Sequence, residues 1–334
     1  MSRQLSPSLA EVGAGEGHPS RGTAAGIEVR GLSKSFGAVR AVDDLTFSVE
    51  PGAVTGFLGP NGAGKTTTLR MLLGLIRPDR GAATIAGLTY RDIPEPSTVV
   101  GAALDASGFH PARTGRAHLQ VYCAVNGLAP QRAEEVLELV GLAAAGGRRI
   151  GGYSLGMRQR LALAVAMLGD PQVLVLDEPA NGLDPEGIVW MRRLLRELAG
   201  QGRTVLVSSH VLTEMQQLVD HVVIIDGGQL RFQGPVAGLA GTQGVVVEVR
   251  ASRSDALRAV LADHEGVSVD HDDSGRLLVS GLDAAAVGRA AFTAGVELQW
   301  LAERDGDLER LFFTLTSGAG SRDQTGSNAS EVGL

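Results

Sequence analysis

The sequence predicts an α/β fold with a mainly parallel central sheet, followed by a smaller α+β domain. Short apolar runs alternate along the chain with helical patterns, as is typical of a parallel sheet covered by helices. The runs are continuous rather than alternating, so we expect strands that are buried on both faces. The expected strands are residues 54–58, 173–176, 204–208 and 222–225, and the expected helices are residues 66–75, 133–140, 158–168, 186–199 and 211–219.

Length and composition agree with a globular protein of more than one domain. A chain of 334 residues, at about 150 residues per domain, corresponds to two domains. Hydrophobic residues make up 44% and charged residues 20%, a balance that provides a sizeable core. Aromatic residues are only 4% and glycine occurs 46 times, so we expect aliphatic cores and several glycine-rich loops.

Charge and cysteine content exclude some classes of protein. The chain has 30 basic and 37 acidic side chains and no basic face that would indicate a nucleic-acid partner. Its one cysteine, Cys123, excludes an internal disulfide and fits a reducing cytosol. Neither a secretory signal nor an apolar run of about 18 residues is present, so we expect a soluble protein whose membrane partner, if it has one, is a separate chain.

Changes in pattern divide the chain into four parts. Residues 1–26 and 317–334 are rich in small and polar residues without periodicity, and we expect disordered tails. Residues 27–240 carry the α/β pattern, with a helical insertion at about 111–170. Residues 241–316 read as β-α-β-β-α-β-α, which is long enough for a small independent domain. The expected strands there are 245–250, 267–269, 277–279 and 296–301, and the expected helices are 254–264, 284–294 and 308–316.

A phosphate-binding motif follows the first apolar strand. Residues 59–66 match G-x-x-x-x-G-K-[ST], and the preceding strand and following helix are the context of a P-loop. Its backbone N–H groups and the helix start favour an anion, Lys65 neutralises the β- and γ-phosphates, and Thr66 ligates Mg²⁺. Lys65 is one of only two lysines in the chain. The expected binding residues are Gly59, Pro60, Asn61, Gly62, Ala63, Gly64, Lys65, Thr66 and Thr67.

Two further strands end in residues suited to phosphoryl transfer. Asp177 and Glu178 follow the run 173–176, at the Walker B position of a P-loop fold. Asp177 is expected to hold Mg²⁺, usually through water, and Glu178 to activate the attacking water as a general base. His210 follows the run 204–208 and is expected to donate to the γ-phosphate.

These motifs resemble those of the ABC ATPase family, the nucleotide-binding subunits of ABC transporters. Residues 153–157 read YSLGM where the family has LSGGQ, and they precede an expected helix. Walker A, helical insertion, signature, Walker B and histidine follow in the family's order between Ile27 and about Gly234. The resemblance implies a P-loop NTPase fold and Mg²⁺-dependent ATP hydrolysis.

The resemblance also implies a dimer of ATPase subunits packed head to tail, with two ATP molecules between them. Ser154 and the N–H of Gly156 would contact the γ-phosphate of the opposite site, and Asp184, at the D-loop position, would bridge the two sites. Phe36 matches the aromatic residue that stacks on adenine, with a core phenylalanine as the open alternative.

The sequence departs from the family at two places. Asp105 occupies the glutamine-loop position; a carboxylate can reach Mg²⁺ or its water but cannot donate a hydrogen bond. Leu155 and Met157 replace the glycine and glutamine of the signature. Because Ser154 and Gly156 are kept, we expect the phosphate contact to survive.

The end of the second domain indicates which class of ABC ATPase the chain resembles. Residues 307–316 resemble the L-E-x-x-F-x-x-L-T ending of type-2 ABC exporter ATPases, although an ordinary closing helix would show the same spacing. The resemblance implies a subunit that energises export of a drug, antibiotic, lipid or peptide through a separate polytopic permease. It would act as a homodimer or heterodimer at the cytoplasmic face of a bacterial plasma membrane.

Three other functions remain as alternatives. An ABC ATPase acting on ribosomes usually has two cores, and one acting on nucleic acid has a long coiled coil between Walker A and Walker B; this chain has one core and no heptads. A GTPase would need an N-K-x-D motif, which neither lysine provides. A regulatory or immunity protein that binds ATP without pumping stays open, although Glu178 favours hydrolysis. We therefore expect no nucleic-acid partner.

Overall fold

The central feature of the first domain is a six-stranded sheet in the order β5-β6-β7-β3-β8-β9. The computed structural model describes residues 25–106, 108–236, 238, 246–264, 266–271 and 275–304. The first five strands pair in parallel and β9 pairs antiparallel with β8, which confirms the predicted mainly parallel sheet. The strands are β3 (Val54–Leu58), β5 (Val100–Ala103), β6 (Val173–Asp177), β7 (Thr204–Ser209), β8 (His221–Asp226) and β9 (Gln229–Pro235).

Both faces of this sheet are covered, which explains the continuous apolar runs. Successive side chains of a strand point to opposite faces, and those of β6 do so into two different cores. Leu174 and Leu176 pack against helices, whereas Val173 and Val175 pack toward a second sheet. Every residue of β3 and β7 is buried.

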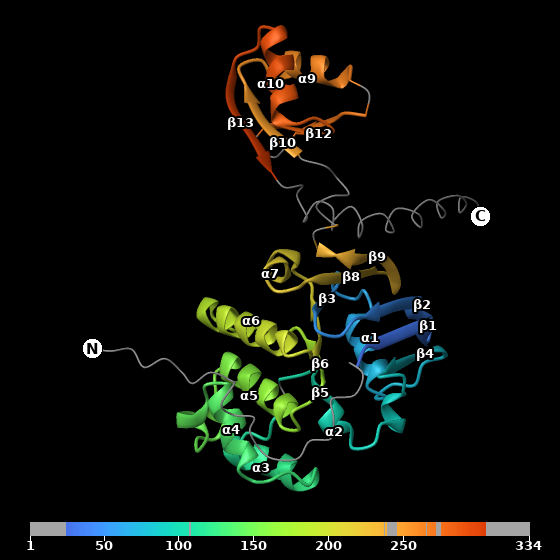
Figure 1. Cartoon of the computed structure of the whole chain (residues 1–334), viewed down its shortest axis with the longest axis vertical. Coiled ribbons are helices and arrows are strands. Elements are labelled where there is room, and N and C mark those ends of the chain that lie inside the picture. The colour runs from blue at the N-terminus through green and yellow to red at the C-terminus, as the bar shows by residue number, and fades with distance from the viewer. Residues whose placement is uncertain are drawn as a thin grey trace, which may run out of the picture.

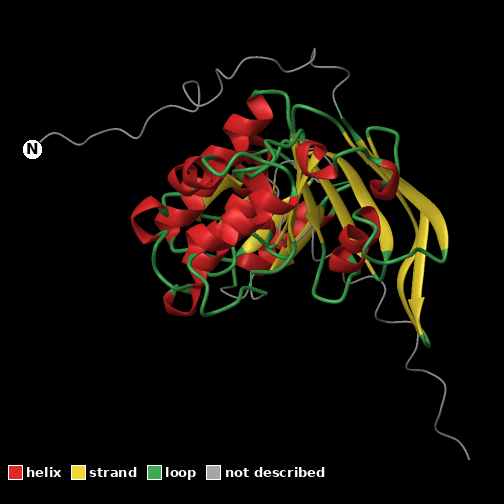
Figure 2. Cartoon of the chain, turned by 90° about the horizontal axis from the view of Figure 1, so that it is seen from below, coloured by secondary structure: helices red, strands yellow, loops and turns green. Residues whose placement is uncertain are grey.

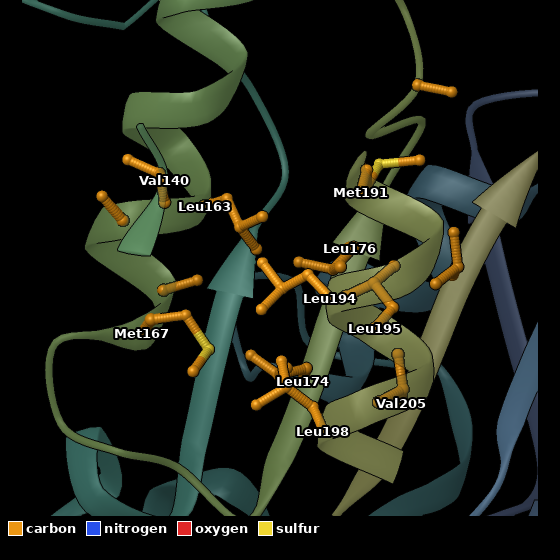
Figure 3. Packing of buried hydrophobic residues seen from close by; sticks show 14 of the residues in the cluster. Val140, Leu163, Met167, Leu174, Leu176, Met191, Leu194, Leu195, Leu198 and Val205 are labelled. Atoms are coloured by element: carbon orange, nitrogen blue, oxygen red, sulfur yellow. The ribbon is translucent and has the colours of Figure 1, made fainter. Parts of the chain in front are cut away.

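Helices α5 (Leu155–Met167) and α6 (Pro185–Gly200) cover one face of the central sheet. In Figure 3, Leu163 and Met167 of α5 and Leu194 of α6 point into the core that they share with Leu174 and Leu176 of β6. Seen from below, most helices lie to one side of the strands (Figure 2). The sheet edge that carries the strand ends is therefore held in place by a helical layer.

The other face is covered by α1 (Lys65–Leu72) and an antiparallel sheet in the order β2-β1-β4. This sheet consists of β1 (Ile27–Phe36), β2 (Val39–Val49) and β4 (Arg80–Ile85). The sequence analysis predicts none of these strands, because buried and exposed residues alternate along them instead of forming continuous apolar runs.

Between β5 and β6 the chain is helical, and it contributes most of its apolar side chains to the core beneath α5 and α6. The segment contains α3 (Gly115–Val125) and α4 (Arg132–Leu139), and the short helix α2 (Pro96–Val99) precedes β5. The hydroxyl of Thr114 caps α3 by accepting a hydrogen bond from Ala117 N at 3.1 Å. Cys123, on α3, is buried in this core.

Three helix ends differ from prediction for local reasons. Helix α5 begins at Leu155 rather than residue 158, because the hydroxyl of Ser154 accepts from Met157 N and caps it. Helix α1 stops at Leu72 because Gly74 takes the left-handed conformation (φ 67°) that closes many helices. Helix α7 (Leu212–Gln216) is shorter than the nine residues that the pattern 211–219 predicts, and backbone turns follow it.

The second domain has its own sheet and its own core (Figure 1). Four antiparallel strands lie in the order β11-β12-β10-β13, and leucines and valines of the two helices pack on one face. The elements are β10 (Val246–Ala251), α9 (Ser254–Ala262), β11 (Ser268–His271), β12 (Leu277–Ser280), α10 (Ala284–Thr293) and β13 (Leu298–Arg304). Their order matches the predicted β-α-β-β-α-β. The predicted helix 308–316, the tail 317–334 and residues 1–24 of the first tail lie outside the described residues.

Candidate nucleotide-binding site

An open cavity of about 380 Å³ lies where the carboxyl ends of β3, β6 and β7 meet. The loop after β3 forms one wall, and Glu178 and His210 form another. These residues come from separate parts of the sequence and are brought together because parallel neighbouring strands end at the same edge. Its lining comprises Ala41, Pro60, Asn61, Gly62, Ala63, Gly64, Lys65, Thr66, Thr67, Glu178, Asn181 and His210.

Two glycines allow the loop to lie close to its neighbours. Gly64, which precedes α1, has φ +100°, and a Cβ atom there would lie 2.3 Å from the carbonyl oxygen of Ala41. A Cβ atom at Gly59 would lie 2.4 Å from the carbonyl oxygen of Ile225. Any larger residue at either position would displace the backbone of the loop. The loop is thereby fixed with the start of α1 facing the cavity.

Lys65 is nearly buried, with 6% of its surface exposed. Its ammonium group donates to the carbonyl oxygens of Gly59 at 2.6 Å and Pro60 at 3.2 Å, and it lies 3.6 Å from Glu178 Oε1. Burial lowers the pKa of Lys65, whereas the carboxylates of Glu178 and Asp177 oppose that change. The ammonium group is therefore turned onto its own loop and held by backbone oxygens.

The carboxylate of Asp177 joins the loop to the sheet. One oxygen accepts a hydrogen bond from Thr66 Oγ1 at 2.7 Å, and the other accepts one from the hydroxyl of Ser208. The Ser208 oxygen in turn accepts from Glu178 N at 2.9 Å. Ser208 is fully buried on β7. Its hydrogen bonds therefore hold Asp177 and Glu178 in a fixed relation.

Glu178 carries a rare backbone conformation for a glutamate, with φ 49°. Residues held in this left-handed region cost roughly 1–3 kcal/mol and persist only where the surroundings fix them. Its carboxylate lies between Lys65 and His210, and Nδ1 of His210 is 2.9 Å from Oε2. The carboxylate is thus aimed into the cavity from the end of β6.

Seven residues predicted from the sequence lie outside the cavity lining, and two of them, Gly59 and Asp177, bond directly to lining residues. Phe36 ends β1 and is 50% exposed, which excludes the core alternative, and Lys34 Nζ lies 5.6 Å from its ring centre. Ser154 caps α5 and Asp184 caps α6, accepting from Gly187 N at 2.8 Å. Gly156 lies in the first turn of α5, and Asp105 is exposed on the loop after β5.

The cavity also contains two residues that were not among the predicted site residues. Asn181 lies in the loop after β6, and Ala41 lies on β2, a strand that the continuous apolar runs do not predict. The position of Asn181 could be predicted from the motif, because Asn181 lies three residues after Glu178 and its N–H closes a turn onto the Glu178 carbonyl oxygen. Ala41 gives no such signal, since its backbone carbonyl group approaches the loop at Gly64 and any residue type would supply that group.

Comparison with known proteins shows which families the chain resembles. A family described as "ABC transporter" matches residues 42–181, which include the loop, the signature and Walker B. A second family, described as a domain of unknown function, matches residues 245–309.

Several curated proteins and solved structures are similar to the chain. The bacitracin transport ATP-binding protein BcrA of Bacillus licheniformis is 41% identical over 241 residues, covering 71% of this chain and 79% of that protein. The daunorubicin resistance ATP-binding protein DrrA3 of Streptomyces coeruleorubidus is 37% identical over 307 residues, covering 87% and 95% respectively. A solved structure of an ATP-binding subunit of an ABC transporter has a TM-score of 0.59 at 28% identity, covering 65% of this chain and 92% of that one. The chain therefore belongs to the family of ABC transporter ATP-binding proteins.

Proposed function

We propose that the chain is the ATP-hydrolysing subunit of an exporter. The observation that carries this proposal is that Lys65, Glu178 and His210 line the same cavity beside a glycine-rich loop. A cation, a carboxylate and an imidazole at a phosphate-binding loop are the groups that transfer of a phosphoryl group to water requires.

The roles of these side chains follow from their positions. The loop Gly59 to Thr67 binds the phosphates through its N–H groups, and Lys65 leaves its carbonyl partners to neutralise them. Glu178 accepts a proton from the attacking water, which its position at the end of β6 allows. His210, hydrogen-bonded to Glu178, orients that carboxylate and donates to the γ-phosphate.

The donor set at Thr66 and Asp177 suits Mg²⁺. A hydroxyl and a carboxylate oxygen lie 2.7 Å apart at the cavity, and Mg²⁺ prefers hard oxygen ligands together with phosphates and water. Among the described residues, no group of three or more His, Cys, Asp and Glu side chains could hold a metal by itself. Thr66 and Asp177 would therefore hold Mg²⁺ together with ATP, and the ion would neutralise phosphate charge. Asp105 would act on that ion or its water from the loop after β5.

A complete site requires a second subunit. Ser154, Gly156 and Asp184 do not line the cavity of their own chain, and Ser154 and Gly156 lie at the exposed start of α5. In a head-to-tail homodimer or heterodimer they would contact the nucleotide held by the other subunit. Phe36, exposed at the end of β1, would stack on adenine.

Transport itself needs another chain. None of the helices within the described residues is both long and apolar enough to cross a bilayer. We propose a separate polytopic permease, with this subunit bound at the cytoplasmic face of a bacterial plasma membrane. Residues 27–240 would form the ATPase domain and residues 241–316 an accessory domain. The relatives named for bacitracin transport and daunorubicin resistance favour export of an antibiotic or similar drug, lipid or peptide.

An affinity pull-down from detergent-solubilised host membranes tests this proposal. We expect mass spectrometry to recover a membrane chain of about six spans, and the purified complex to hydrolyse ATP. Recovery of ribosomal or DNA-repair proteins without a membrane chain would contradict the exporter and leave an ATPase of another class.

A further inference from the structure

The first two turns of α5 contact the segment that carries Glu178 within the same subunit. Leu155 and Gln159 are four residues apart, so they lie on one face of the helix. Leu155 reaches Gly182, and Gln159 reaches the backbone of Glu178. One helix face therefore contacts both ends of the turn formed by residues 178–182.

Leu155 lies directly against the backbone of Gly182. A Cβ atom built at Gly182 would be 2.3 Å from Cδ2 and 2.4 Å from Cγ of Leu155, distances that no side chain could share with the leucine. Gly182 has φ +78°, and its carbonyl oxygen would lie 3.0 Å from a Cβ atom at Gly156. The start of α5 and this turn are thus in direct contact, and Leu155 stands where the family signature has glycine.

Gln159 acts at the other end of the turn. Its side-chain amide donates to the carbonyl oxygen of Glu178 at 3.4 Å, and Asn181 N donates to the same oxygen at 3.1 Å. Both donors thus hold the backbone of Glu178, a residue with the unusual φ of 49°. Asn181 also lines the nucleotide cavity, which links the turn to the bound substrate.

We propose that Leu155 and Gln159 are positioning residues that hold residues 178–182 so that the Glu178 carboxylate is aimed for hydrolysis. The inference rests on the function proposed above. Because the start of α5 would face the second subunit's nucleotide, a displacement of α5 would be transmitted through Leu155 to the turn and through Gln159 to Glu178. Hydrolysis by Glu178 of one subunit would then depend on whether the signature of that subunit contacts the nucleotide held by the other subunit.

Steady-state ATPase assays on the full-length chain test this link, with nucleotide affinity measured separately. We expect Leu155→Gly and Gln159→Ala each to lower kcat by roughly tenfold, because small displacements of catalytic groups have large effects on rate. ATP affinity should stay within about twofold and the Hill coefficient for ATP should fall, since the phosphate loop is untouched and the sites lose their coupling. Leu155→Met, which keeps the volume, should restore the rate.

A matched control and a double variant separate positioning from general destabilisation. Leu75 is exposed like Leu155 (67% against 57%) and follows α1, so Leu75→Gly should leave kcat unchanged. Gly182→Ala places a methyl group onto Leu155 and should lower kcat. The double variant Gly182→Ala/Leu155→Gly removes this clash. Its kcat should therefore be higher than that of Gly182→Ala alone, although both variants have alanine at the strained φ of residue 182.

Three results would overturn the proposal. They are a kcat for Leu155→Gly equal to that of Leu75→Gly, a loss of ATP affinity that matches the loss of kcat, and additive effects in the double variant. Glu178→Gln, assayed in parallel, separates this failure from failure of the proposed function. If Glu178→Gln is inactive while Leu155→Gly and Gln159→Ala turn over normally, the site assignment stands and only the positioning role is lost.

Discussion

Nδ1 of His210 lies 2.9 Å from Oε2 of Glu178, across the ends of two neighbouring strands. The contact joins the proposed base to the residue that we propose donates to the γ-phosphate. Lys65 approaches the other oxygen of the same carboxylate at 3.6 Å. The carboxylate is thus flanked by a cation and an imidazole.

Replacing Glu178 by glutamine should keep ATP binding and abolish turnover. The amide preserves shape but cannot accept a proton, and positioned general bases contribute about 10²–10⁴-fold to rate. ATP hydrolysis and nucleotide affinity are measured on the same preparation. Glu197→Gln, an exposed change on α6, serves as the control. Normal hydrolysis in Glu178→Gln would remove this residue from the role of base.

Lys65→Ala should weaken nucleotide binding strongly. Loss of a hydrogen-bonded charge costs roughly 1.5–3 kcal/mol, which is about ten- to hundredfold in affinity. Titration with a fluorescent ATP analogue measures the change, and Arg70→Ala, on the exposed side of α1, is the comparison. An unchanged dissociation constant would show that Lys65 does not bind the phosphates.

Asp105→Gln restores the residue that the family has at this position. Because Asp105 lies on an exposed loop and does not line the cavity, ATP affinity should stay near normal. The measurement is ATP binding with and without Mg²⁺. A large loss of Mg²⁺-dependent affinity would instead identify Asp105 as a primary metal contact.

His118 should make the folded protein sensitive to acid. Its ring is buried between Phe109 and Tyr122 and neither nitrogen has a partner. Burial lowers the pKa of His118, and the charge of Arg113 adds to this. In the unfolded chain the histidine has a pKa of about 6.5, so the unfolded chain binds the proton more readily than the folded one. Protonation of His118 therefore leaves the free energy of unfolding unchanged above that pH and lowers it as the pH drops through that value.

The variant His118→Phe tests this sign. It removes the titrating ring nitrogens, so its Tm should fall less between pH 7.5 and pH 5.5 than that of the unchanged protein. Thermal unfolding followed by circular dichroism gives the comparison, with His264→Phe, an exposed position, as the control. An equal loss of Tm in the His118 variant would exclude His118 as the source.

The parts of the site that sequence could predict are those defined by spacing along the chain. The loop from Gly59 to Thr66 and the pair Asp177 and Glu178 follow buried strands, and the sheet topology brings them together. Ser208 could not be foreseen, because its role depends on the register that sets it opposite Asp177. The same holds for Leu155, whose importance appears only once Gly182 is seen beneath it.

The sequence likewise predicts some strands of the fold and not others. Strands covered on both sides have a composition that identifies them, as β3 shows. Strands β1 and β2 are covered on one side, and their alternating pattern includes charged residues such as Glu28 and Arg30. The exposure of Phe36 at the end of β1 likewise depends on the hairpin with β2, and it excludes core packing, while adenine stacking stays a prediction.

The buried thiol of Cys123 has a practical consequence for spectroscopy. Burial raises the pKa of this thiol, and the thiolate is the reactive form, so maleimide probes should spare it in the folded chain. Since the sequence has no other cysteine, a cysteine introduced at a surface position becomes the sole labelling point. Spin or fluorophore labels at such positions could test whether two subunits approach each other, as proposed, without first removing a native thiol.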